Sequence, residues 1–214
     1  MNQFSYKNFY RRNLPHIQPE GATIFITFRL ANSLPKEVVE RLLAEKEQAE
    51  AKINQITDKI EREKQLYLEQ RRSFGKWDEA LDSLASGEKY LANPQIADML
   101  AESLHYRDGK VYDLEAFCIM PNHAHLVCTP LENVIGKHHT LSEIMHSLKR
   151  HTAREANLIL GRIGTFWQHE NYDHVVRDAA ELERIIKYVL INPVKAGLVD
   201  DWTKWKWSYC KYDM

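Results

Sequence analysis

The spacing of hydrophobic and polar residues predicts a chain of mixed α and β structure. Residues 22–30 (ATIFITFRL) are β-branched and aromatic, which is typical of a strand buried on both faces. Residues 110–120, and the apolar residues that follow Pro121-Asn122, predict two more strands joined by a turn. The start of the segment 165–176 predicts a further strand. Apolar residues recur at helical spacing in three segments, namely 94–106, 140–160 and 178–192.

Local signals place the ends of these helices. The Asn-Pro pair at 93–94 is typical of an N-cap followed by the first helical residue. Thr140, with Glu143 three residues later, has the capping-box arrangement. We expect the last helix to stop near Asn192, because Pro193 disfavours helical geometry in the residue before it.

Residues 36–72 contain no Gly or Pro, and their apolar residues are spaced about 3.5 apart. This pattern predicts one long helix or a helical hairpin, inserted at about 36–92 in a single domain that spans 1–214. The insertion is either an arm that contacts protein or DNA, or a solvated spacer. The tail beyond residue 200 is expected to pack as an irregular lid. The order of elements predicts an α+β fold, a ferredoxin-like or RNA-recognition-like antiparallel sheet with helices on one face.

The composition is that of an ordinary globular protein, with 44% hydrophobic and 28% charged residues among 214. We expect no membrane span and a cytoplasmic location, because no apolar run approaches about 20 residues and the N-terminus lacks a signal-peptide core. Three cysteines match neither a disulfide framework nor a zinc ribbon. The net charge is −1, but basic residues gather in 1–35 and 137–162, which fits either phosphate binding or solvated helix faces.

The stretch FCIMPNHAHLVCT, residues 117–129, contains a pair of histidines separated by one residue. Because residues two apart on a strand point to the same face, His123 and His125 are neighbours, with Cα atoms about 6–7 Å apart. Two imidazoles in this arrangement can share one metal ion. The alternative is an ordinary pair of buried histidines whose nitrogens are satisfied by hydrogen bonds.

Tyr188 and Asn192 form a second pair of interest. They are four residues apart in the last predicted helix, so they lie on one helical face. The pair presents a hydroxyl nucleophile beside an amide oxygen that can ligate a hard metal. Opposite the histidines, they would form a site for attack on a phosphodiester. The alternative is a tyrosine that serves in packing and an asparagine that ends a helix.

Several segments resemble, in order, the REP-associated tyrosine transposases, which are HUH (His-hydrophobe-His) single-strand DNA endonucleases. These segments are ITFRLANSLP (26–35), MPNHAHLV (120–127), FWQHENYDHVVRD (166–178), YVLINPVKAGLV (188–199) and WKWSY (205–209). The resemblance implies a transposase-like nuclease that acts on hairpin-forming single-stranded DNA, as a monomer or a homodimer. It implies His123, His125 and Asn192 as metal ligands, and Tyr188 as the nucleophile.

The expected chemistry is a transesterification through a 5′-phosphotyrosine, which conserves the phosphodiester bond and leaves a free 3′-hydroxyl. A tyrosine hydroxyl, with an unperturbed pKa of about 10, is a poor nucleophile at neutral pH. A divalent cation offsets this by polarising the phosphate and stabilising charge in the transition state. Two imidazoles and an amide oxygen suit Mg²⁺ or Mn²⁺, and they can also hold Zn²⁺.

Other residues are weaker candidates for parts of the site. Tyr172, which lies between His169 and His174 in the sequence, is an alternative nucleophile. His169 and Glu170 belong to the metal shell, the DNA contacts or a structural polar cluster. Trp167 either stacks with a base or lies in the core, and Cys118 is expected in the core. The predicted DNA contacts are basic residues, Lys149, Arg150, Arg154 and Arg12.

Two other kinds of protein fit parts of this pattern. One is a non-catalytic DNA-hairpin-binding protein that keeps the fold. A hairpin oligonucleotide that is bound but left uncut with Mn²⁺ would identify it. The other is a histidine-triad nucleotide hydrolase, which needs a third histidine where this chain has Val127.

Overall fold

The computed structural model describes residues 9–12, 14–17, 20–83 and 87–213, with side chains described from residue 20 onward. The chain forms two compact units. One comprises residues 32–88 and the other comprises the remainder. No helix in the described ranges is both long and apolar enough to cross a membrane.

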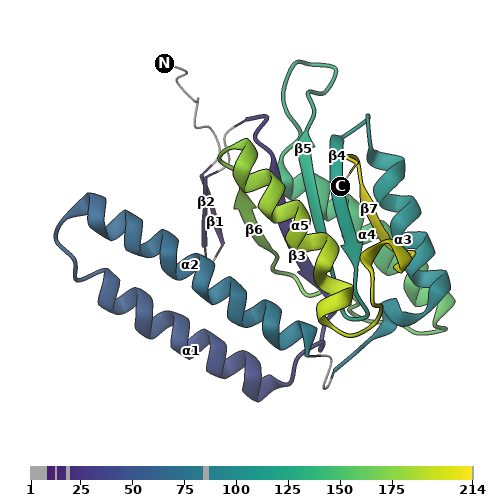
Figure 1. Ribbon diagram of the computed structural model, residues 1–214, viewed down its shortest axis with the longest axis horizontal. Coiled ribbons are helices and arrows are strands. Elements are labelled where there is room, and N and C mark those ends of the chain that lie inside the picture. Colours follow the sequence, from purple (N-terminus) through teal and green to yellow (C-terminus); the bar gives the residue numbers. More distant parts are fainter. Residues whose placement is uncertain (1–8, 13, 18–19, 84–86, 214) are drawn as a thin grey trace. The chain divides into compact units, whose positions relative to one another are not determined.

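The larger unit is built around a five-stranded antiparallel sheet (Figure 1). Its strands are β3 (Ile24–Arg29), β4 (Tyr112–Ile119), β5 (His123–Pro130), β6 (Tyr172–Val175) and β7 (Ser208–Cys210). They run in the order β6-β3-β5-β4-β7 across the sheet. A separate two-stranded sheet pairs β1 (Phe9–Arg12) with β2 (Leu14–Ile17). The first four strands of the main sheet, with their two intervening helices, follow the β-α-β-β-α-β order of a ferredoxin-like fold.

Helices cover both faces of the sheet. The helices of the larger unit are α3 (Pro94–Arg107), α4 (Leu141–Ile159) and α5 (Ala179–Lys195). Leu100 of α3 and Leu148 of α4 enclose one hydrophobic core with Ile26 and Phe28 of β3, and all four are fully buried. This confirms the predicted α+β class and its antiparallel sheet. The expectation of helices on one face describes α3 and α4, whereas α5 crosses the other face, where it lies in front of the strands in Figure 1.

The helix caps form where local signals predicted them. The Asn93 side chain accepts a hydrogen bond from the Gln95 backbone, and Thr140 and Glu143 cap each other. The end of α5 differs from the prediction, because the helix continues through Pro193 to Lys195. A proline near the end of a helix removes just one donor, so the helix can continue past it. Leu198 N donates to the Pro193 carbonyl at 2.9 Å, which closes the C-terminal end of the helix.

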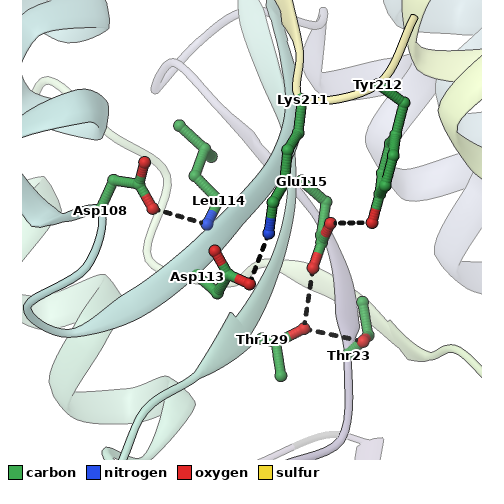
Figure 2. A network of polar contacts seen from close by, with 8 residues as sticks. All are labelled: Thr23, Asp108, Asp113, Leu114, Glu115, Thr129, Lys211 and Tyr212. Carbon is green, nitrogen blue, oxygen red and sulfur yellow. Dashed lines mark hydrogen bonds and ion pairs between the residues drawn. The ribbon is translucent and has the colours of Figure 1, made fainter.

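The C-terminal tail joins the sheet and does not form the irregular lid that we expected. Its strand β7 pairs with β4 beside a bulge between Leu114 and Ala116. Glu115, the residue in the bulge, is buried, and its carboxyl group accepts a hydrogen bond from the Tyr212 hydroxyl (Figure 2). A partner strand three residues long leaves too little hydrophobic alternation to predict a strand from sequence.

We expect Tyr212→Phe to weaken the attachment of this tail in a pH-dependent way. Its hydrogen bond to Glu115 raises the pKa of Tyr212 to about 12. A folded pKa above the unfolded value means that the bond stabilises the fold below pH 10 and loses its effect as the pH rises toward 12. Because Tyr212 is 44% exposed, the loss should fall near the lower end of about 0.5–1.5 kcal/mol.

Urea unfolding at pH 8 and pH 11 checks this expectation. The difference between wild type and Tyr212→Phe should shrink at the higher pH. Tyr106→Phe, at an exposed position of α3, is the control. A difference of the same size at both pH values would contradict the role of the phenol proton.

The smaller unit is a pair of helices, α1 (Lys36–Ile53) and α2 (Lys59–Asp82), which pack side by side. Of the two predicted alternatives, the helical hairpin is therefore the observed one. The second helix is capped by Asp58, whose side chain accepts a hydrogen bond from Glu61 N at 2.8 Å. Lys76 of α2 forms an ion pair with Glu45 of α1.

Candidate metal and nucleophile site

His123 is the first residue of β5 and His125 is the third. The pairing of β5 with β3 fixes the direction of their side chains. In the antiparallel register, His125 pairs with Thr27 of β3 and His123 pairs with Arg29. These residues alternate with Ile26 and the other residues that face α3 and α4, so both imidazoles point to the opposite face. Both side chains are fully buried, and their Nε2 atoms lie 3.0 Å apart.

Each imidazole is oriented by an oxygen at its other nitrogen. His123 Nδ1 lies 2.7 Å from Asn122 Oδ1, and His125 Nδ1 lies 2.8 Å from Thr27 Oγ1. When both Nδ1 atoms donate their protons to these oxygens, both Nε2 atoms present lone pairs to the same point. Two lone pairs at 3.0 Å repel each other unless a cation or a proton lies between them. The outer hydrogen bonds thus favour the metal-binding tautomer.

Asn192 completes the set from the facing helix. Its amide nitrogen lies 2.9 Å from His125 Nε2, and the side chain is fully buried. Rotation of the amide by half a turn would bring its oxygen to the same point. Ligands at right angles, about 2.1 Å from an ion, are about 3.0 Å apart. The residues present therefore fit a small divalent cation with two nitrogen ligands and one oxygen ligand.

Burial keeps the imidazoles ready to act as ligands. It lowers the pKa of His123 to about 3, and it holds the pKa of His125 well below its usual range, with His123 and Lys195 acting in the same direction. Metal-binding histidine must be neutral. Protons therefore do not compete for these nitrogens near neutral pH.

Tyr188 stands beside this cluster, one turn before Asn192 on α5. The centroid of its ring lies 5.9 Å from that of His125 and 6.1 Å from that of Phe25, in edge-to-face geometry with both rings. Phe25 also stacks on His125, with centroids 5.7 Å apart. The tyrosine is half-buried, so its ring is held while part of it stays accessible.

We expect Thr27→Val to weaken metal binding at this site. The hydroxyl of Thr27 orients His125, and loss of such an outer partner typically lowers metal affinity by about 10–100-fold. Titration calorimetry with Mn²⁺ checks this loss. Thr23→Val is the control, because Thr23 lies on the same face but bonds to Thr129 at 2.8 Å. Equal affinity in the two variants would contradict the role of Thr27.

Tyr172, the alternative nucleophile, lies on the same face. It pairs with Thr27 across β3 and β6, and its ring contacts Phe25 with centroids 6.2 Å apart. It is therefore one strand further from His125 than Thr27 is. Cys118 pairs with His125 from β4, so it lies on the histidine face of the sheet, and it is fully buried there.

The polar residues around Tyr172 form pairs of their own. His169 and Glu170 are exposed, and His169 Nδ1 lies 3.3 Å from Glu170 Oε1. His174 Nε2 lies 3.1 Å from Glu181 Oε1, and both of these side chains are largely buried. Trp167 is buried, and its indole nitrogen donates to Thr152, so it belongs to the core and not to an exposed stacking surface.

The predicted DNA contacts lie elsewhere. Lys149, Arg150 and Arg154 are on α4, which packs on the sheet face opposite the histidines. Lys149 donates to the backbone carbonyl of Gln168 at 2.6 Å, while the two arginines are exposed. Arg12 ends β1, and its side chain lies outside the described part of the chain.

Several residues of the site carry no motif strong enough to identify them from sequence. Thr27 and Phe25 look like ordinary strand residues, and their register against β5 reveals their roles. Arg29 was one of many basic residues, but its pairing with His123 places it on the histidine face. The alternation of 22–30 could have grouped these three on one face.

Comparison with known proteins adds to this geometry. No protein-family model matches the chain. Over 102 residues, which is 45% of this chain, the sequence is 28% identical to a protein of Haemophilus influenzae described as a REP-associated tyrosine transposase. The match covers 58% of that relative, so the chain spans less than two thirds of its length. The chain resembles the REP-associated tyrosine transposases.

The resemblance extends to the fold. A solved structure of a REP-associated tyrosine transposase bound to a REP hairpin matches 94% of this chain and 82% of its own, with a TM-score of 0.50 and 18% identity. At this level of identity the likeness shows the fold. The resemblance expected from the sequence motifs is confirmed, and so is the mixed α+β architecture.

Proposed function

We propose that the chain is a REP-associated tyrosine transposase that cleaves and rejoins hairpin-forming single-stranded DNA. One observation carries this proposal. His125 Nε2 lies 3.0 Å from His123 Nε2 and 2.9 Å from the Asn192 amide nitrogen, and the Tyr188 ring lies against His125. A divalent-ion site beside a phenol is the arrangement that attack on a phosphodiester requires.

Each residue of the site has a proposed role in the cleavage reaction. His123, His125 and Asn192 would hold Mg²⁺ or Mn²⁺, which when bound polarises the phosphate oxygens and stabilises the negative charge of the transition state. Asn122 and Thr27 keep the imidazoles oriented. Tyr188 attacks phosphorus through its phenol oxygen, and the bond to the 3′ oxygen breaks. The chain then carries the 5′-phosphate as a phosphotyrosine, and the DNA keeps a free 3′-hydroxyl.

The proposed substrate is single-stranded DNA with a hairpin, since the solved relative is bound to a REP hairpin. Lys149, Arg150, Arg154 and Arg12 stay proposed DNA contacts. Because α4 is on the far face, its basic residues would hold the hairpin stem away from the cleaved bond. Arg29, which lies opposite His123 in the register of β3 and β5, is better placed to contact the DNA strand that is cleaved. A single domain with a helical insertion, monomeric or dimeric action and a cytoplasmic location all stay predictions.

One experiment tests the function. The protein is mixed with a labelled single-stranded hairpin oligonucleotide and Mn²⁺, then denatured and separated by electrophoresis. The expected product is a denaturation-resistant adduct that depends on the metal and disappears with a chelator. A hairpin that is bound but stays uncut would favour the non-catalytic DNA-binding protein. The histidine-triad alternative lacks support in this site, because Val127 pairs with Phe25 where a third imidazole is needed.

A further inference from the structure

Lys195 lies in the last turn of α5, seven residues after Tyr188 and therefore on the same face of the helix. Its ammonium nitrogen is 4.4 Å from the centroid of the Tyr188 ring. The side chain is exposed and approaches the ring that also contacts His125. A cation over an aromatic face is attracted by the ring, and the contact places the charge beside the nucleophile.

The charge of Lys195 is available for a ligand. Four other lysines of this unit end against carboxylates, namely Lys187 on Glu183 (2.5 Å), Lys204 on Asp200 (2.7 Å), Lys206 on Asp98 (2.7 Å) and Lys211 on Asp113 (2.6 Å). Within the described ranges, Lys195 forms no ion pair. The ring lies on one side of the ammonium group, which has three N–H donors, so donors on its other sides can bind a ligand.

We propose that Lys195 binds a non-bridging oxygen of the scissile phosphodiester and holds that phosphate between the Tyr188 hydroxyl and the histidine pair. This proposal rests on the proposed function and adds a residue to it. A lysine ammonium is a compact point charge that suits a phosphate oxygen. The contact reaches from the helix side, whereas the histidines reach from the sheet side.

The bonds made and broken are unchanged by this contact. The phenol oxygen of Tyr188 bonds to phosphorus and releases its proton to water. The bond between phosphorus and the 3′ oxygen breaks, and its electron pair stays on that oxygen, which takes a proton from water. Lys195 keeps its three protons throughout and contributes a fixed positive charge.

A binding measurement tests the contact without cleavage. Tyr188→Phe is the background, and a fluorescent single-stranded hairpin oligonucleotide with Mn²⁺ is titrated at 50 to 200 mM salt. Adding Lys195→Gln should weaken binding about tenfold at low salt. It should also reduce the slope of log affinity against log salt by about 0.7, the value for one phosphate contact on a single strand. Lys187→Gln, on the same helix, is the matched control and should leave the slope unchanged.

A rate measurement tests the consequence in the chain with Tyr188 intact. At saturating DNA, Lys195→Gln should slow adduct formation about 100-fold, within the range for loss of one charge-stabilising donor. Lys195→Arg should recover most of the rate, which a purely structural role would not predict. Wild-type slope and rate in Lys195→Gln, or equal losses in Lys187→Gln, would overturn the proposal. A slope that depends on Lys195 with no adduct from the wild type would instead discard the nuclease function and keep the phosphate contact.

Discussion

Tyr188→Phe should abolish the covalent DNA adduct and leave hairpin binding within about threefold of wild type. The change removes one oxygen atom and keeps the ring, so the edge-to-face contacts with His125 and Phe25 persist. Without the phenol oxygen no phosphotyrosine can form, and the expected loss exceeds about 1,000-fold, the scale seen when a nucleophile is removed. Electrophoresis of denatured reactions measures the adduct, and fluorescence anisotropy measures binding.

Tyr172→Phe is the matched control, because Tyr172 presents the second phenol on this face of the sheet. Its adduct yield should stay near that of wild type. Adduct of normal yield in Tyr188→Phe, with loss in Tyr172→Phe, would transfer the nucleophile to β6. Mass spectrometry of the adduct after nuclease digestion identifies the modified tyrosine directly.

His125→Ala should remove metal binding and adduct formation together. His125 contacts the other two proposed ligands, with its Nε2 atom 3.0 Å from His123 Nε2 and 2.9 Å from Asn192 Nδ2. Loss of His125 removes the side chain that both His123 and Asn192 contact, and it leaves two of the three proposed ligands. We expect Mn²⁺ affinity to fall at least about 100-fold and the adduct to become undetectable at micromolar metal.

Thermal unfolding with and without Mn²⁺ separates this effect from misfolding. A ligand that binds the folded chain raises its melting temperature by mass action, so wild type should shift upward with the metal and His125→Ala should not. His105→Ala is the control, since His105 lies on α3 against Phe117 and Tyr209. A metal-dependent shift of wild-type size in His125→Ala would exclude this imidazole as a ligand.

Local rules predicted much of this molecule. The β-branched run 22–30 became β3, and the caps at Asn93 and Thr140 formed as expected, because each depends on residues within one turn of helix. The spacing of His123 and His125 placed both imidazoles on one face, since strand geometry leaves no other choice.

Features set by distant parts of the chain were harder to predict. The helical spacing of Tyr188 and Asn192 was visible, but the face that α5 covers depends on packing against β4 and β5. The strand β7 exists because β4 offers it an edge. The helical hairpin was one of the two predicted alternatives, but the position of its turn was not predicted, because the surrounding composition favours helix throughout. Asp58 caps α2 by accepting a hydrogen bond from Glu61 N.

The Thr27, His125 and Asn192 contacts all come from one polypeptide, and so does the neighbouring phenol. Under the proposed function, one chain would supply both the metal ligands and the nucleophile, so cleavage would not require an encounter between two copies. The rate of DNA cleavage per protein molecule would then be the same in dilute and in concentrated protein solution. Pairing of copies, where it occurs, would serve to bring two DNA ends together.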